Sequence, residues 1–185
     1  LESPHRYCSE FFKVEKGDII LDLGVAEGNF SLYHVDLAKE IYLFESNNKW
    51  VEALQKTFEP YSEKVKIINK RVSNLLSETS IALDEIKGLS SQTLFVKIDV
   101  DGSENEVLSG MIDLLKTSKN IKVAICTYHN QSDAFEFENL KYSKLRMTIK
   151  NPESLILKRY HPLLFTYNLL HPKNISLEEI LVVIK

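Results

Sequence analysis

Short apolar runs alternate with helical patterns through about the first two-thirds of the chain. Five of these runs have the length and composition of β-strands: residues 18–24, 41–46, 65–69, 93–100 and 121–128. Between the first three runs, apolar residues recur at helical spacing over residues 30–37 and 51–58. This alternation predicts βαβ units, and therefore an α/β fold of three layers in which helices cover both faces of a mostly parallel central sheet.

The fourth strand leads directly into another helical pattern, whose apolar face consists of Val107, Leu108, Met111, Ile112 and Leu115. Residues 73–92 are polar and serine-rich, which predicts a loop with one short helix around residues 81–86. The last third of the chain changes character, since residues 157–170 and 176–185 are strand-rich. We expect a C-terminal antiparallel hairpin at the sheet edge and, without an internal repeat, a single domain spanning residues 1–185.

Composition narrows the choice of protein class. The chain has 185 residues, 44% of them hydrophobic and 26% charged, as in ordinary globular domains. A net charge of −3 and a pI near 6.0 provide no general attraction to nucleic acid or anionic membranes. We see no apolar stretch of about 20 residues and no signal-peptide pattern. Cys8 and Cys126 are too few for a disulfide framework. We expect a cytoplasmic protein that binds neither nucleic acid nor membrane.

The fourth strand carries unusual charges for a buried run. Alternation places Lys97, Asp99 and Asp101 on one side of this strand. Burying ionised groups is costly unless they are paired or used by a ligand, and a lysine between carboxylates can form such a paired network. Ser103 is expected to cap the following helix, and Glu104 to favour its N-terminus. The alternative is that these residues only organise the corner between strand and helix.

A glycine turn follows the first strand in the stretch DLGVAEGNF, residues 22–30. A dinucleotide fingerprint requires glycines at positions 24, 26 and 29, and only Gly24 complies. The pattern for S-adenosylmethionine is instead an acidic residue followed by small residues at alternate positions: Asp22, Gly24, Ala26 and Gly28. The turn therefore favours S-adenosylmethionine over NAD, and a purely structural turn is the remaining alternative.

Glu45 ends the second strand about twenty residues after this turn, where a carboxylate of such a fold reaches the paired hydroxyls of a ribose. The alternative is an ordinary exposed glutamate at a strand end. Residues 69–73 end the third strand, where an adenine ring would lie, although a polar turn there needs no ligand.

Together these segments resemble class I S-adenosylmethionine-dependent methyltransferases, and among them the FkbM family. Residues 22–31 match its Asp-x-Gly-Ala turn, residues 44–46 its Phe-Glu-Pro strand end, and residues 71–73 its Ala-Val-Ser stretch. The most specific match is KIDVDGSENEVLSG, residues 97–110, against Lys-x-Asp-Val-Glu-Gly-x-Glu-x-x-x-Leu-x-Gly. Residues 126–133 look like a variant of the family's fifth strand end. The departures from the family pattern are Val25, Ser46, Arg71 and Asp101.

The resemblance implies a Rossmann-like methyltransferase fold with S-adenosyl-L-methionine as cofactor. The cofactor-binding residues that it implies are Asp22, Gly24, Ala26, Gly28, Glu45, Ser46, Arg71 and Asp99. It further implies O-methylation of a hydroxyl on a sugar or secondary metabolite, so that the partner is a small-molecule or glycan acceptor. N-methylation uses the same geometry. The rival interpretation is a non-catalytic domain that binds S-adenosylmethionine or S-adenosylhomocysteine, or that serves as an interaction module.

Methyl transfer to an alcohol requires a proton acceptor in addition to alignment of the reactants. Asp99 and His129 lie at the ends of the fourth and fifth strands, which are adjacent in this kind of sheet, and we predict both as catalytic residues. Histidine has an ordinary pKa near 6.5, which suits a general base at neutral pH. Asp99, His129 and Asp133 offer an alternative magnesium site, but our prediction includes no metal.

Overall fold

A computed structural model of the chain describes residues 7–8, 12–118 and 120–126. Its centre is a five-stranded sheet with the strand order β3-β2-β1-β6-β7. All four neighbouring pairs run parallel. The strands are β1 (Ile19–Leu23), β2 (Glu40–Phe44), β3 (Val65–Ile68), β6 (Thr93–Ile98) and β7 (Asn120–Ile125). Each corresponds to one of the five predicted strands, so the predicted mostly parallel α/β sheet is confirmed.

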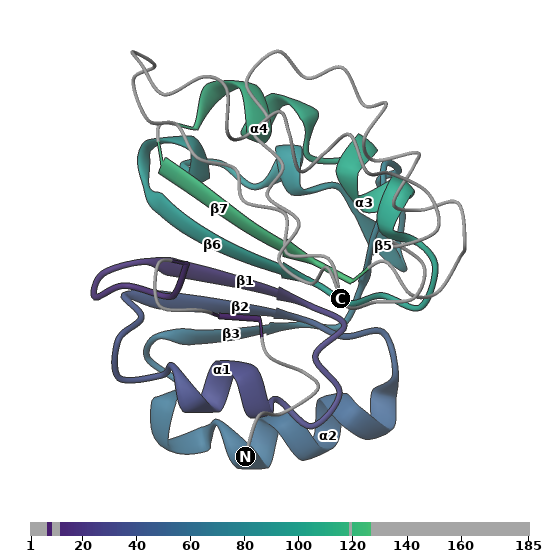
Figure 1. Ribbon diagram of the computed structural model, residues 1–185. Helices are drawn as coiled ribbons and strands as arrows, with labels where there is room; N and C mark the ends of the chain where they lie inside the picture. Colours follow the sequence, from purple (N-terminus) through teal and green to yellow (C-terminus); the bar gives the residue numbers. More distant parts are fainter. Residues whose placement is uncertain (1–6, 9–11, 119, 127–185) are drawn as a thin grey trace, which may run out of the picture.

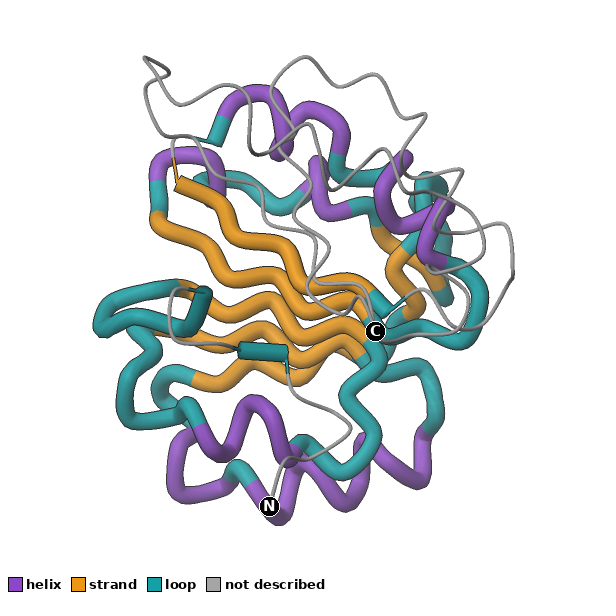
Figure 2. The backbone as a smooth tube through the Cα atoms, viewed as in Figure 1, coloured by secondary structure: helices purple, strands orange, loops and turns teal. Residues whose placement is uncertain are grey.

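Helices cover both faces of this sheet (Figure 1). On one face lie α1 (Asn29–Tyr33) and α2 (Asn48–Thr57), and on the other lie α3 (Glu104–Ser109) and α4 (Ile112–Thr117). Coloured by secondary structure, the backbone shows the five-stranded sheet as a central layer between the two helical layers (Figure 2). Short 3₁₀ helices complete the connections: η1 (Glu59–Tyr61), η2 (Leu83–Glu85) and η3 (Leu89–Ser91).

Each helical layer encloses its own hydrophobic core. Val96 and Ile98 of β6 belong to the core that also contains Val107 and Leu115 from the α3–α4 side. Phe95 of β6 belongs to the other core, which also contains side chains of α2. This division follows directly from the alternation of side chains along a strand.

Two of the predicted helices are shorter than the hydrophobic pattern indicates. The helix after β1 ends at Tyr33, and both Tyr33 and Leu37 are exposed, whereas His34 and Val35 are buried. The helix after β6 is interrupted, so that α3 and α4 are separate. At the interruption Gly110 lies against backbone: a Cβ added there would stand 2.1 Å from the carbonyl oxygen of Ser73.

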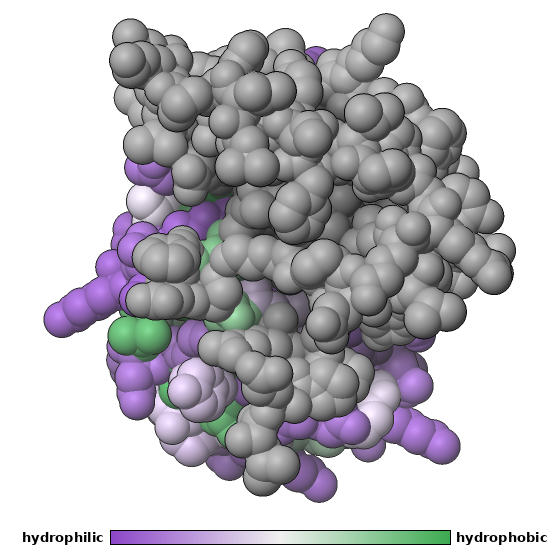
Figure 3. Space-filling model, in the orientation of Figure 1, coloured by the Kyte–Doolittle hydropathy of each residue, from purple (hydrophilic) through white to green (hydrophobic). Residues whose placement is uncertain are grey.

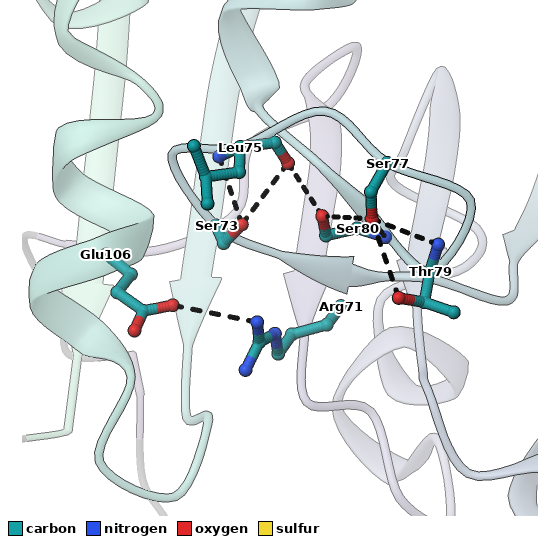
Figure 4. Close-up of polar contacts among 7 residues, drawn as sticks. All are labelled: Arg71, Ser73, Leu75, Ser77, Thr79, Ser80 and Glu106. Carbon is teal, nitrogen blue, oxygen red and sulfur yellow. Dashed lines mark hydrogen bonds and ion pairs between the residues drawn. The ribbon is translucent and has the colours of Figure 1, made fainter.

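The segment between β3 and β6 is more ordered than the predicted loop. It contains the predicted short helix as η2, and also a parallel pair formed by β4 (Arg71–Val72) and β5 (Ser80–Ile81). The hydroxyls of Ser77 and Ser80 lie 2.7 Å apart, and the Ser80 hydroxyl donates to the carbonyl oxygen of Leu75 (Figure 4). The Asp84 carboxylate of η2 accepts the backbone N–H groups of Asp113 and Leu114 and thereby caps α4.

The described surface visible in Figure 3 is mainly hydrophilic, with small hydrophobic patches. The exposed large hydrophobic residues of the described part of the chain include Leu32, Tyr33, Leu37, Leu75 and Leu76. Among the described residues we find no helix with the length and apolar character needed to cross a membrane. The predicted C-terminal hairpin, residues 157–185, lies outside the described residues.

Candidate functional site

The strand order of the sheet reverses between β1 and β6, because β2 and β3 follow on one side of β1 while β6 and β7 lie on the other. In open α/β sheets, ligands bind beyond the carboxyl ends of the strands at such a switch point. The register aligns these ends, since Leu23 pairs with both Phe44 and Ile98. The next residues, Gly24 and Glu45, therefore begin at the same edge of the sheet as Asp99.

The turn after β1 requires its glycines for two different reasons. Gly24 has φ +72°, and a Cβ there would stand 1.8 Å from the backbone oxygen of Asp99. Gly28 has φ +78°, and its Cβ would stand 2.7 Å from the Leu54 side chain of α2. Ala26 between them also has a positive φ, 48°. Gly24 thus lets the turn approach the end of β6, and Gly28 lets it pack against α2.

Glu45 bonds to this turn directly. Its Oε2 accepts the backbone N–H of Ala26 at 3.1 Å, and its Oε1 accepts that of Asn47 at 2.8 Å. The side chain is nearly buried, with 9% of the residue exposed. The predicted ribose-binding carboxylate therefore also connects the end of β2 to the middle of the turn, and fixes the position of both.

Asp22 lies beneath the turn in a buried charged network. It pairs with Lys97 across the β1–β6 register, with 3.1 Å between Lys97 Nζ and Asp22 Oδ1. The Ser31 hydroxyl donates to Asp22 Oδ2 at 2.7 Å, and Lys97 Nζ donates to the carbonyl oxygen of Gly24 at 2.5 Å. Asp22 is completely buried. The predicted pairing of Lys97 is thus present, although its partner is Asp22 on the neighbouring strand.

Asp99 interacts with a residue that the sequence analysis did not identify. The Tyr7 hydroxyl donates to Asp99 Oδ2 at 2.5 Å. The Tyr7 ring lies under the Lys97 ammonium, 5.4 Å from Nζ to the ring centroid, and meets Phe30 edge-on. Cys126, directly after β7, places its Sγ 3.9 Å from the Tyr7 hydroxyl. No periodic pattern surrounds Tyr7, and its partner is 92 positions away, so no local sequence signal indicates this contact.

Burial and the nearby carboxylate keep both of these groups protonated. Burial, followed by the hydrogen bond to Asp99, strongly raises the pKa of Tyr7. Burial, together with the negative charge of Asp99, raises the pKa of Cys126 to about 12. Near neutral pH the Tyr7 phenol is therefore a neutral hydrogen-bond donor, and Cys126 is a thiol.

His34 lies at the C-cap of α1 and is buried. Its Nδ1 lies 2.8 Å from the carbonyl oxygen of Phe30 and donates to it, which leaves Nε2 to accept from the Cys8 thiol at 3.7 Å. Burial lowers the His34 pKa, against smaller opposing effects of the Phe30 carbonyl and the Asp22 charge. His34 therefore acts as a neutral packing residue beneath the N-terminal residues Tyr7 and Cys8.

The corner after β6 differs from the prediction in two details. The strand ends at Ile98, and Asp101 lies in a turn with φ +48° and an exposed side chain, so it does not share a strand face with Lys97. Ser103 occupies the N-cap position of α3, but its side chain makes no capping hydrogen bond. Instead, Glu104 is buried, and its Oε1 accepts the backbone N–H of Gly102 at 3.4 Å.

Ser46 and Arg71 lie at the periphery of the site. Both are exposed. Arg71 extends from β4 toward Glu106 of α3, with 4.0 Å between Nη2 and Oε2 (Figure 4). His129 and Asp133 lie outside the described residues, so their predicted roles stay predictions. Within residues 7–8, 12–118 and 120–126, no group of three or more His, Cys, Asp or Glu side chains is arranged to hold a metal ion.

Comparison with known proteins identifies the fold. No protein-family model and no curated protein sequence matches the chain. Among solved structures it is similar to a methyltransferase FkbM from Methylobacillus flagellatus KT, with 18% identity and a TM-score of 0.61. That alignment covers 71% of this chain and 38% of the other, so the chain spans well under half of that protein. The chain therefore has the predicted α/β Rossmann-like fold.

Two further structures are similar to the chain but superpose more loosely. An rRNA methylase from Streptococcus thermophilus gives 12% identity and a TM-score of 0.47, covering 69% of this chain and 72% of that one. A precorrin-6y C5,15-methyltransferase from Geobacter metallireducens GS-15 gives 13% identity and a TM-score of 0.41, covering 58% and 51%. At these TM-scores, neither similarity contributes to the argument.

Proposed function

We propose that the chain is an S-adenosylmethionine-dependent methyltransferase of the FkbM type that O-methylates a hydroxyl on a sugar or secondary metabolite. The observation that carries this proposal is the shared register of Leu23, Phe44 and Ile98. This register brings a small-residue turn, a carboxylate at the end of β2 and Asp99 to one edge of the sheet at its switch point.

The residues at this edge fit the cofactor. Gly24, Ala26 and Gly28 form a turn of positive φ, and its two glycines let the backbone of the turn lie close to the end of β6 and to α2. Glu45 supplies the acceptor oxygens that a pair of ribose hydroxyls requires, and Ser46 and Arg71 flank the place of the adenine. When bound, the cofactor supplies a methyl group already activated on a sulfonium. Asp22 has no exposed surface, so its contribution is to hold the turn through Lys97.

The chain itself then has to position the acceptor, exclude water and take up a proton. Asp99 is the proton acceptor within the described residues, and His129 is the second predicted one. Lys97 helps to position Asp99 indirectly, because Lys97 binds the carbonyl oxygen of Gly24, and Gly24 lies against the Asp99 backbone. A positioned general base contributes about 10²–10⁴-fold to such a reaction. Alignment of the reacting atoms supplies most of the remainder.

Calorimetric titration of the full chain with S-adenosylhomocysteine tests cofactor binding, with NAD as the competing ligand. We expect heat from S-adenosylhomocysteine alone. Glu45→Gln should weaken binding about tenfold or more, about 1.4 kcal/mol per factor of ten, because the amide provides one acceptor oxygen in place of two. Glu40→Gln, at the opposite end of the same strand, is the matched control and should leave affinity within about twofold. Equal binding by both variants would contradict the role of Glu45.

Turnover separates an enzyme from a binding module. The measurement is S-adenosylhomocysteine formed from S-adenosylmethionine over a panel of sugar and phenolic acceptors. Asp99→Asn should reduce turnover by about 10²–10⁴-fold, a larger factor than any loss of S-adenosylhomocysteine affinity. If wild type binds the ligand but transfers no methyl group to any acceptor, the chain is a binding domain.

A further inference from the structure

Tyr7 occupies a position that the proposed reaction requires for its acceptor. Its hydroxyl donates to Asp99 Oδ2 at 2.5 Å, directly beyond the carboxyl end of β6. An acceptor hydroxyl that passes its proton to Asp99 has to lie within the same hydrogen-bonding distance of that carboxylate. In the structure, the Tyr7 hydroxyl occupies this position next to the Asp99 carboxylate.

The surroundings of the Tyr7 ring are suited to an aromatic group in particular. The Lys97 ammonium lies 5.4 Å from the ring centroid, which is a cation–π arrangement. Phe30 contacts the ring edge-on, with centroids 5.5 Å apart and an interplanar angle of 80°. The Cys126 thiol lies beside the hydroxyl. A saturated sugar ring in this place would lose both the cation–π and the edge-on aromatic contact.

This inference rests on the proposed function: we propose that the Tyr7 side chain occupies the acceptor site. The acceptor is a phenol, whose ring and hydroxyl replace those of Tyr7. In the transfer step, the phenolic O–H gives its proton to Asp99. Its oxygen forms a bond to the methyl carbon of S-adenosylmethionine as the S–CH₃ bond breaks. The sulfur keeps the electron pair of that bond, and the products are the aryl methyl ether and S-adenosylhomocysteine.

The first test restores the missing side chain in Tyr7→Ala with p-cresol, which has the atoms of the tyrosine side chain beyond Cα. At about ten times its dissociation constant, p-cresol should raise the melting temperature of this variant by about 3–6 °C. Wild type should respond at least severalfold less at this concentration, since p-cresol has to displace Tyr7 there. Tyr33→Ala removes a tyrosine that is 84% exposed, and as the matched control it should respond no more than wild type.

Two analogues of p-cresol separate the contribution of the hydroxyl to binding from that of the aromatic ring. Toluene lacks the hydroxyl that donates to Asp99, and 4-methylcyclohexanol keeps a hydroxyl but lacks the aromatic ring. Both should give shifts at least severalfold smaller than p-cresol at equal concentration. An equal shift with toluene would overturn the hydrogen bond to Asp99 as the basis of binding. An equal shift with 4-methylcyclohexanol would overturn the phenol class.

The second test follows transfer in Tyr7→Ala with S-adenosylmethionine and p-cresol. Mass spectrometry should detect 4-methylanisole, at least tenfold more than from Tyr7→Ala/Asp99→Ala. Binding of p-cresol without ether formation would overturn the proposal. Titration of wild type with S-adenosylhomocysteine is independent of this result, so heat in that titration would leave the proposed function standing.

A third measurement uses wild type and does not depend on the folding of Tyr7→Ala. Excess p-cresol, added with S-adenosylhomocysteine, should displace Tyr7 and speed trypsin cleavage of the bond between Arg6 and Tyr7 severalfold. Toluene at the same concentration should not. Equal cleavage rates with the two compounds would overturn the proposal.

Discussion

The two sides of β6 use burial in different ways. Toward α3 and α4, Val96 and Ile98 join a core of mainly aliphatic side chains. Toward α1, Phe95 packs among aromatic residues, and Lys97 forms a buried ion pair with Asp22. The aliphatic side contributes hydrophobic stabilisation, which does not depend on direction. The polar side fixes the ends of two strands and the turn between them in one arrangement, which is what a ligand site requires.

The largest difference in the free energy of unfolding between substitutions on the two sides of β6 should come from breaking the Lys97–Asp22 ion pair. Lys97→Met leaves the Asp22 carboxylate buried without its cation, which we expect to cost about 3–5 kcal/mol in the free energy of unfolding. Ile98→Val, the neighbouring residue on the aliphatic side, should cost about 0.5–1.5 kcal/mol. Urea denaturation followed by circular dichroism measures both values.

Adding Asp22→Asn to Lys97→Met removes the unpaired charge and should recover part of the loss. If Lys97→Met costs no more than Ile98→Val, the ion pair is not important to stability. The two sides of β6 would then differ in composition only.

The next largest loss of stability should come from disturbing the close contact between the turn after β1 and the end of β6. Gly24→Ala and Gly88→Ala both place a side chain on a backbone with positive φ, +72° and +86°. At Gly24 the new Cβ also meets the Asp99 carbonyl, whereas nothing lies within 4 Å of it at Gly88. We expect Gly88→Ala to cost about 1 kcal/mol and Gly24→Ala about 1–3 kcal/mol more.

Gly24→Ala should also abolish the heat of S-adenosylhomocysteine binding, and Gly88→Ala should retain it. Similar unfolding free energies for the two variants would show that the turn can move away from β6. In that case the turn does not need its close contact with Asp99.

The smallest effect should be a pH dependence of the free energy of unfolding that His34, on the polar side of β6, causes. Burial places the folded-state pKa of His34 below the ordinary 6.5. As pH falls below 6.5, His34 of the unfolded chain binds a proton that His34 of the folded chain does not. The free energy of unfolding therefore decreases, by at most about 1.4 kcal/mol per pH unit. His34→Gln has no such titration, so its difference in unfolding free energy from wild type should shrink between pH 7 and pH 5. A constant difference would contradict a neutral, buried His34.

The sheet could be predicted from the sequence because each strand is a short apolar run bounded by turn residues, a local signal. The edge at which Gly24, Glu45 and Asp99 meet also follows from the sequence, since parallel strands bring their carboxyl ends together. The ion-pair partner of Lys97 could not be predicted in this way. It depends on the pairing of β1 with β6, which are separated by about 70 residues in the chain.

Several features that the hydrophobic pattern did not predict depend on distant contacts. The pattern from Val107 to Leu115 is continuous, and the interruption at Gly110 reflects backbone contact with Ser73. The half-buried Tyr7 contacts Asp99, and the buried His34 contacts Cys8, in each case a partner distant in the chain. Hydrophobic periodicity describes which face of an element is buried, and it contains no information about such partners.

The cap on α4 has a consequence for how the chain folds. The Asp84 carboxylate that accepts from Asp113 and Leu114 is supplied 29 and 30 positions earlier. A helix of six residues does not form alone in water. Residues 71–92 and α4 should therefore acquire native structure as a single cooperative unit, with matching hydrogen-exchange rates.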